Sequence, residues 1–414
     1  MSRIEELIAE ECPDGVPYLA IGSASVSERV VAGATPKTGV VEFWEHGTIP
    51  WMSSGEVSKG TVCETDQFIT QAAYDATSTK LVPSGTVVIA LAGQGKTRGT
   101  VARTRIELCT NQSLASIVVA EEMDSDFLYY YLQTQYQELR DISSGEGTRG
   151  GLNLQMIKAY KVPVPPIEVQ RAIVEILDMF SKLDAELDAE LEARKEQYGH
   201  YRAGFLEFDL DAVDTVVLSD GFETRNGYTP PKSDPTNWAN GTVPWFRMED
   251  IRENGRVLDR ALQMIPEKAV KGGRHFPANS LIFATSATIG EHALVTVPYL
   301  ANQRFTAVWP KQEYAGRFDM KFLFHYGFVI DGWCRNNTTT SSFASVDMSG
   351  FKRLVIPIPP LETQKRIAEQ LDKFDALVND LSIGLPAELA ARRQQYKYYR
   401  DKLLTFNELK KDAI

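Results

Sequence analysis

The stretch V-P-V-P-P-I-E-V-Q-R-A-I-V-E-I-L-D-M-F-S-K-L at residues 162–183 decides the architecture, because it returns as I-P-I-P-P-L-E-T-Q-K-R-I-A-E-Q-L-D-K-F-D-A-L at residues 356–377. Each position in the second copy has a number 194 higher than its match in the first. An internal repeat sets the architecture before any single element is assigned. The sequence therefore predicts a duplicated body plan, in which a globular segment and a long helix each occur twice.

The same offset relates the segments that precede these two copies. The stretch W-E-H-G-T-I-P-W at 44–51 matches W-A-N-G-T-V-P-W at 238–245, and the glycine, threonine and proline at 33–36 match those at 227–230. T-N-Q-S at 110–113 corresponds to A-N-Q-R at 301–304 with an offset of 191, which predicts a loop three residues shorter in the second half.

Each repeated block opens with prolines, which cannot continue a preceding helix and are compatible with a first helical turn. Apolar residues then recur in steps of three, four or seven, the pattern of a coiled-coil seam. About forty such residues would span roughly 60 Å. The predicted seam residues are Ile173, Leu177, Phe180, Leu187, Leu191, Ile367, Leu371, Phe374 and Leu381. A four-residue stutter between Leu381 and Leu389, with Gly384 and Pro386 nearby, predicts a kink or short break in the second helix.

These patterns predict an α+β chain of five parts. They are an N-terminal helix at 1–15, a globular domain at 16–160, a central helix at 161–208, a second globular domain at 209–354 and a C-terminal helix at 355–408.

Composition narrows the class of protein. The chain has 414 residues and a formal net charge of −11, no apolar run long enough to span a membrane, and a start without signal-peptide character, so we expect a cytoplasmic location. Its four cysteines are scattered without C-x-x-C spacing or nearby histidines, so no metal or disulfide is expected. The acidic balance argues against a strongly basic surface but allows local basic patches.

If the chain binds a nucleic acid, the candidate contacts are basic, amide and hydroxyl side chains in loops of the two globular domains, because such groups bind phosphates and base edges. Four basic residues fall within the ten residues 96–105, and S-G-E-G-T-R-G-G-L before the central helix is either a contact loop or a plain linker. The tryptophans at 51 and 245 are expected in the core rather than as stacking platforms. The candidates are Lys96, Arg98, Arg103, Arg105, Asn111, Gln112, Thr148, Arg149, Arg225, Lys232, Arg247, Arg274, Asn302, Gln303, Arg304, Ser341 and Ser342.

One motif points to an alternative function. A-L-A-G-Q-G-K-T at 90–97 satisfies the loose P-loop pattern, but β-branched residues follow where a phosphate cradle needs a helix. We therefore expect a basic loop here rather than a nucleotide site. No catalytic motif is found in the sequence, so an enzyme is not expected. A coiled-coil scaffold that does not read DNA is the other alternative.

The twice-occurring proline-helix block and the E-F-W-E-H-G-T-I-P-W stretch at 42–51 resemble the specificity (S) subunit of type I restriction-modification systems. The resemblance covers essentially the whole chain. It implies two target recognition domains that each read one half of a bipartite site on double-stranded DNA, with the two helices forming an antiparallel coiled coil that fixes the spacer between the half-sites.

The resemblance also implies partners. Two modification (M) subunits would bind S-adenosylmethionine and methylate adenine, and restriction (R) subunits would use ATP and Mg²⁺. No cofactor is expected on this chain itself.

Overall fold

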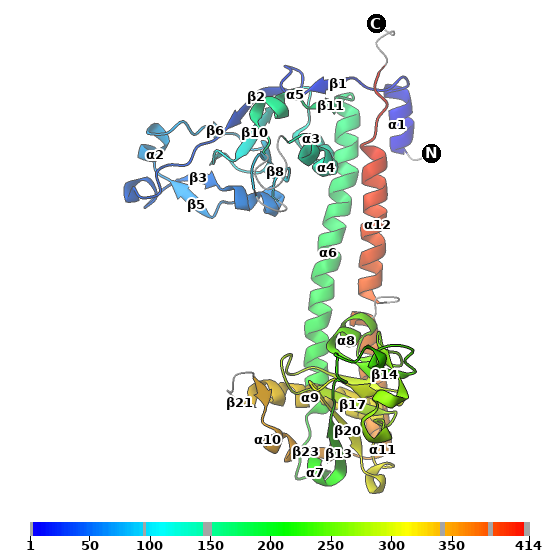
Figure 1. Cartoon of the computed structure of the whole chain (residues 1–414). Helices are drawn as coiled ribbons and strands as arrows, with labels where there is room; N and C mark the ends of the chain where they lie inside the picture. Colours follow the sequence, from blue (N-terminus) through cyan, green and yellow to red (C-terminus); the bar gives the residue numbers. More distant parts are fainter. Residues whose placement is uncertain (1–2, 94–96, 144–150, 340–343, 380–383, 410–414) are drawn as a thin grey trace. The chain divides into compact units, whose positions relative to one another are not determined.

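The computed structural model describes residues 3–93, 97–143, 151–339, 344–379 and 384–409. The chain divides into two compact units (Figure 1). Unit 1 comprises Met1–Glu186 and Leu389–Ile414, and unit 2 comprises Leu187–Glu388.

Unit 1 combines strands with short helices around a common core. Its strands are β1 (Tyr18–Ala20), β2 (Ser27–Ala32), β3 (Ile49–Met52), β4 (Thr61–Val62), β5 (Gln67–Ile69), β6 (Leu81–Val82), β7 (Val87–Ala90), β8 (Val101–Thr104), β9 (Leu108–Thr110), β10 (Leu114–Val119) and β11 (Lys161–Pro163). Its short helices are α1 (Arg3–Glu11), α2 (Gln71–Asp75), α3 (Ser125–Thr134), α4 (Tyr136–Asp141) and α5 (Leu154–Ala159).

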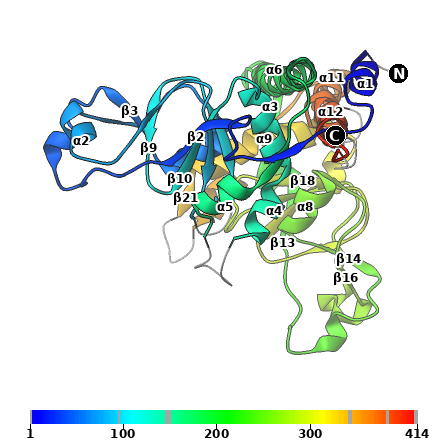
Figure 2. The same cartoon turned by 90° about the horizontal axis from the view of Figure 1, so that it is seen from above.

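The strands of unit 1 form a five-stranded sheet in the order β2-β10-β7-β8-β4, a four-stranded sheet β5-β3-β9-β6, and the pair β1-β11. Figure 2 shows the sheet that contains β3 and β9 lying beyond β2 and β10, together with α2. The central strand β7, V-V-I-A, is buried along its whole length, as expected for an apolar run covered on both faces.

Unit 2 repeats most of these elements in the same order, but its second sheet has three strands where that of unit 1 has four, and it has an additional two-stranded pair. Its strands are β12 (Asp214–Val217), β13 (Phe222–Asn226), β14 (Val243–Phe246), β15 (Val257–Leu258), β16 (Met264–Ile265), β17 (Ser280–Ala284), β18 (His292–Val295), β19 (Leu300–Ala301), β20 (Phe305–Pro310), β21 (Thr338–Thr339), β22 (Ser345–Val346) and β23 (Val355–Ile358). Its short helices are α7 (Leu218–Gly221), α8 (Met248–Asn254) and α10 (Met348–Lys352), and its long helices are α9 (Met320–Asn336) and α11 (Leu361–Asn379).

The two units share one topology, which confirms the predicted duplication. The sheet β13-β20-β17-β18-β15 repeats the order of the first five-stranded sheet, and β12-β23 repeats β1-β11. In both units the tryptophan-bearing strand pairs antiparallel with one neighbour and parallel with another, as β3 does with β5 and β9 and β14 does with β16 and β19. The predicted shortening lies between the third and fourth strands, where ten residues (91–100) join β7 to β8 but seven (285–291) join β17 to β18.

The two repeated blocks form helices that begin directly after their prolines. Helix α6 (Ile167–Leu206) is continuous for 40 residues, and α11 begins at Leu361. A further helix, α12 (Leu385–Leu403), starts with Pro386 in its first turn. Residues 380–383, on which most of the predicted break and the seam residue Leu381 fall, lie outside the described residues.

Helix pairing can be followed inside each unit. In unit 1, Phe180 of α6 lies 6.0 Å from Tyr396 and 5.8 Å from Tyr399 of α12, between ring centroids. Asp184, one turn further along α6, binds Arg393 at 2.9 Å, so the numbering of the two helices runs in opposite directions (Figure 1). In unit 2, Phe374 of α11 stacks in the same way on Tyr198 and Tyr201 of α6, at 6.3 and 5.3 Å.

Some of the predicted seam residues pack against the globular fold as well as against another helix. Ile173 and Leu177 are fully buried in the core of unit 1 together with Phe127 of α3. Leu371 is fully buried and Ile367 is 7% exposed, while Leu191 is 8% exposed and Leu187 is half-buried. The globular fold therefore covers this face of α6 together with α12, whose Leu403 belongs to the same core.

A buried glutamine joins the start of each repeated helix to the globular fold. In unit 1, Gln170 donates to Pro165 O at 2.8 Å and Glu122 O at 2.9 Å, and accepts from Asp124 N at 2.8 Å. In unit 2, Gln364 makes the matching bonds with Pro359 O, Arg317 O and Asp319 N at 2.8, 2.9 and 2.9 Å. The glutamine of the repeated P-P-x-E-x-Q motif is therefore a structural clamp.

No helix in the part of the chain that the structure describes is long and apolar enough to cross a membrane. The predicted N-terminal helix is α1, whose Ile4 and Leu7 pack against the core of unit 1.

Candidate nucleic-acid interface

A pair of tryptophans occupies the equivalent position in each unit and forms the floor of the candidate interface. Trp245 is 3% exposed, donates from Nε1 to Tyr228 O at 3.0 Å, and meets Trp238 edge-on at 5.0 Å between centroids. Trp51 of unit 1 is 4% exposed and makes the corresponding bond to Ala34 O at 3.0 Å. The expectation that Trp51 and Trp245 are core residues is confirmed.

An Asn-Gln turn lies next to each tryptophan pair. The Asn302 side-chain oxygen accepts from Arg304 N at 3.0 Å, and Asn111 accepts from Ser113 N at the same distance. The adjacent Gln303 accepts a hydrogen bond from the Thr229 hydroxyl, as Gln112 accepts one from Thr35 in unit 1. These paired bonds fix the loop after β9 and the loop after β19 in the same conformation.

A glycine lets the neighbouring backbone approach this turn. A Cβ on Gly227 would lie 2.1 Å from Asn302 O, and one on Gly33 would lie 1.6 Å from Thr110 O. Neither distance is possible for real atoms. The repeated G-x-T-P motif is therefore required by close packing of two backbone segments.

A buried carboxylate supports the loop after each tryptophan strand. Asp250, fully buried, accepts from Arg247 N at 2.7 Å and Leu262 N at 2.6 Å. Glu56, 3% exposed, accepts from Ser53 N at 2.8 Å and Asp66 N at 2.9 Å. Arg247 and Ser53 thus occupy equivalent backbone positions.

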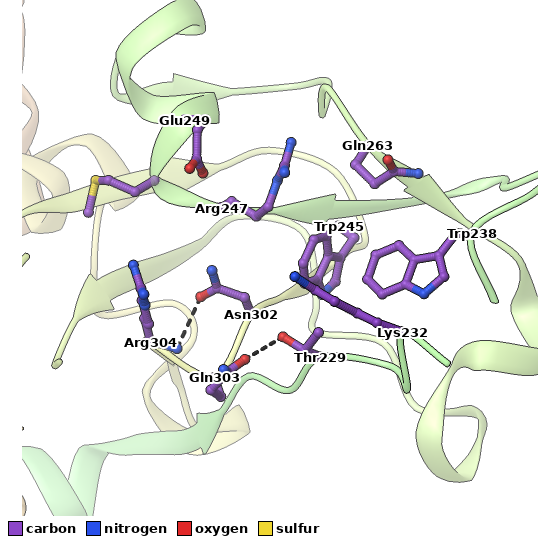
Figure 3. Close-up of a pocket in the computed structure, with 11 residues that line it drawn as sticks. Thr229, Lys232, Trp238, Trp245, Arg247, Glu249, Gln263, Asn302, Gln303 and Arg304 are labelled. Atoms are coloured by element: carbon purple, nitrogen blue, oxygen red, sulfur yellow. Dashed lines mark hydrogen bonds between the residues drawn. The ribbon is translucent and has the colours of Figure 1, made fainter. Parts of the chain in front are cut away.

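In unit 2 these parts enclose a pocket of about 560 Å³ (Figure 3). It combines basic, amide and aromatic side chains. The lining residues are Thr229, Lys232, Trp238, Trp245, Arg247, Met248, Glu249, Gln263, Asn302, Gln303 and Arg304. The structure thereby brings together five predicted candidates from three distant segments, namely Lys232, Arg247, Asn302, Gln303 and Arg304.

The two arginines of this pocket form no ion pair with any residue that the structure describes. Arg247 is half-buried with its guanidinium carbon 5.6 Å from the Trp245 ring centre, and its enclosed Nε has no hydrogen-bond partner among the described residues. Arg304 is exposed, and its guanidinium makes no hydrogen bond or ion pair to any residue that the structure describes. Such groups suit an anionic or hydrogen-bond-accepting ligand.

Two predicted residues of unit 2 lie elsewhere. Arg225 donates to Arg274 O at 2.9 Å and lies 4.8 Å from the centre of the Phe276 ring. Arg274 is exposed. Neither lines the pocket.

In unit 1 the predicted basic cluster is largely neutralised. Arg103 is 12% exposed, binds Asp126 at 3.0 Å and Asp178 at 3.3 Å, and lies 4.9 Å from the Tyr129 ring centre. Arg105 binds Asp126 at 2.9 Å. Carboxylates distant in sequence thus pair with both arginines, and a role for Arg103 and Arg105 in DNA contact stays a prediction. Arg98 is half-buried and offers its carbonyl to Arg140 at 3.3 Å.

Five further candidates lie outside the described residues. They are Lys96, Thr148, Arg149, Ser341 and Ser342. The next described element after β7 is the strand β8, whereas a P-loop is followed by a helix. The geometry around the described part of this loop does not fit a phosphate cradle.

Several lining residues were not among the predicted candidates, notably Thr229, Trp238, Glu249 and Gln263. The first two belong to the repeated G-x-T-P and W-x-x-G-T-x-P-W motifs, so the repeat itself carried information about their role. Glu249 and Gln263 enter through α8 and the segment before β16, and no sequence pattern marks them.

The carboxylate of the repeated L-D-x-F motif links helix to globular fold in both units. In unit 2, Asp372 accepts from His325 Nε2 at 2.8 Å and binds Lys321 at 2.6 Å. Burial would raise the pKa of Asp372, but the hydrogen bonds from His325 and Lys321 outweigh it and lower that pKa. In unit 1, Asp178 instead accepts from the Tyr130 hydroxyl at 2.5 Å.

The described residues contain no group of three or more His, Cys, Asp or Glu side chains placed to hold a metal ion.

The chain contains two copies of one α/β unit. Each copy has its own helix and presents polar loops around a tryptophan pair. This arrangement defines a duplicated recognition protein rather than a protein organised around a single cleft. A family model described as the type I restriction modification DNA specificity domain matches residues 26–193 and again residues 211–391. The chain belongs to this family.

Individual relatives agree with this assignment. The chain is 56% identical over 213 residues to the type I restriction enzyme EcoprrI specificity subunit of Escherichia coli, covering 49% of this chain and 53% of that protein. It is 34% identical over 292 residues to the EcoR124I/EcoR124II specificity subunit of the same organism, covering 68% and 70%. The first match thus spans about half of that relative's length.

Solved structures show the same fold. A chain from a study of complex assembly and conformational transition of the type I R-M system aligns with a TM-score of 0.66 at 17% identity, covering 95% of this chain and 98% of that one. The HsdS subunit from Thermoanaerobacter tengcongensis aligns with a TM-score of 0.53 at 17% identity, covering 95% and 97%.

Proposed function

We propose that this chain is the DNA specificity subunit of a type I restriction-modification complex, and that each unit reads one half of a bipartite target. The proposal rests on the two equivalent sets of hydrogen-bonded loops around Trp51 and Trp245, which we call the two frames. The two frames hold their loops with the same hydrogen bonds but present different side chains, as two readers of different sequences should.

The long helices are proposed to set the distance between the half-sites. A continuous 40-residue helix such as α6 is about 60 Å long, which exceeds the 34–36 Å between half-sites one turn apart. Changing the helices by whole heptads should change the unspecified spacer and leave both half-sites intact.

Catalysis is assigned to partners. Two modification subunits would supply S-adenosylmethionine and the methyl transfer, and restriction subunits would supply ATP-driven cleavage, while this chain contributes sequence reading in the cytoplasm. The net charge of −11 supports this division, because strong affinity for DNA phosphates must then come largely from the assembled complex.

The test is selection from a random duplex library by the chain assembled with its modification subunits. The proposal predicts a bipartite consensus with two specified blocks and an unspecified spacer. Recovery of sequences without any consensus would leave a helical assembly scaffold as the better description.

A further inference from the structure

The two frames differ in charge at two equivalent positions, and this difference indicates which base unit 2 recognises. Arg247 and Ser53 are equivalent because each backbone N–H binds a buried carboxylate, Asp250 at 2.7 Å and Glu56 at 2.8 Å. Arg304 and Ser113 are equivalent because each backbone N–H binds the oxygen of the preceding asparagine at 3.0 Å. At both positions unit 2 has arginine where unit 1 has serine.

Arg247 is held in place before any ligand arrives. Its guanidinium lies over the face of the buried Trp245, which restricts its rotamers, and its Nε is enclosed without a partner among the described residues. Because Nε is enclosed, the two terminal amino groups of Arg247 are the donors that remain for a ligand, and they form no hydrogen bond to a described residue.

Arg304 completes the arrangement from the other side of the pocket. It follows Asn302 and Gln303, whose side chains are fixed by Arg304 N and the Thr229 hydroxyl (Figure 3). Glu249 is the one carboxylate among the lining residues, and it forms no ion pair with either arginine in the described structure. The two guanidinium groups therefore remain available to a ligand.

We propose that Arg247 and Arg304 are specificity-determining residues that make the half-site of unit 2 contain guanine. Guanine presents two acceptors, O6 and N7, to the major groove, and the planar fork of arginine matches both at once. A serine hydroxyl can donate or accept and does not select one base in this way. At the two equivalent positions, unit 1 presents the hydroxyls of Ser53 and Ser113 instead. The inference rests on the proposed function, because it assumes that the pocket faces DNA.

The experiment grafts the residues of unit 1 onto unit 2. Arg247→Ser, Arg304→Ser and the double variant, each assembled with the modification subunits, are compared with the unaltered chain by library selection. We expect the preference for guanine at one or two positions of one half-site to fall by about 5- to 150-fold, with the other half-site unchanged. Arg304→Lys and Arg247→Lys should lower the guanine preference by less than the serine variants and keep most of the total affinity, because lysine keeps the charge and can still donate to O6 and N7 but lacks the planar fork.

Lys232→Thr, which installs the residue at the equivalent position 38, is the matched control for a phosphate contact. It should weaken all sequences alike and lower the salt dependence by about one unit of slope. If the serine variants behave like this control, or keep their guanine preference in full, the inference is overturned while the bipartite function stands. If the serine variants do not fold, the lysine variants decide in the same way. A wild-type complex without any consensus would instead refute the proposed function.

Discussion

Replacing Gln364 with leucine tests the clamp that joins α11 to the globular part of unit 2. The substitution removes the only described partners of Pro359 O, Arg317 O and Asp319 N, all within 2.9 Å of a fully buried side chain. The bond to Pro359 O is buried and the other two are part-buried, so one buried polar group is left without a partner and we expect unit 2 to lose about 1–3 kcal/mol. For a unit of roughly 200 residues this corresponds to a fall in Tm of about 2–12 °C.

Thermal unfolding would be followed with the thiol of Cys334 as a local reporter, because it is 1% exposed and lies in unit 2. Gln312→Leu, at an exposed position of the same unit, is the matched control and should leave the Tm nearly unchanged. A Gln364→Leu variant that unfolds within about 0.5 kcal/mol of this control would refute the argument, because surface substitutions alone produce effects of that size.

Three further outcomes follow from the packing and the protonation equilibria. The pKa of Asp372 is lowered in the folded state. Its contribution to the stability of unit 2 is therefore complete above the ordinary carboxyl pKa near 4 and is lost as the pH falls through the lower folded-state pKa. The acid unfolding transition should be less steep in Asp372→Asn. Gly227→Ala should destabilise unit 2 by about 1–3 kcal/mol or more in denaturant titrations, whereas Gly316→Ala, with nothing within 4 Å of the new Cβ, should not. Burial raises the pKa of the Cys109 thiol to about 11, so in mass-spectrometric labelling the exposed Cys63 should react first, and equal rates would contradict the described core.

The sequence predicted the duplication because a shared frame needs the same residues twice. Gly227 and Gly33 cannot carry a side chain, and Gln364 and Gln170 have no room to vary their three hydrogen bonds. Positions with such constraints stay alike in both copies, so the repeat was visible without any structural information.

Apolar periodicity was less informative about what covers a buried face. It placed Ile173 on a helix–helix seam, and the side chain is indeed buried, but it shares the core of the globular fold with Phe127. A spacing of three or four residues shows that a face is covered and does not show by which element.

Charge was the least predictable property from sequence. Arg103 belongs to a run without nearby acids in the sequence, yet Asp126 and Asp178 reach it in the fold. Arg247 is in a segment with three acidic neighbours in sequence, yet its guanidinium lies on Trp245. Whether an arginine is available to a ligand depends on partners brought together by the fold.

Methylome sequencing of cells that express the chain with its modification subunits tests the central claim most directly when residues 20–160 are exchanged for the corresponding segment of a relative. Two independent reading units predict that one half of the methylated motif changes while the other half and the spacer length persist. A change in both halves at once would contradict the modular account.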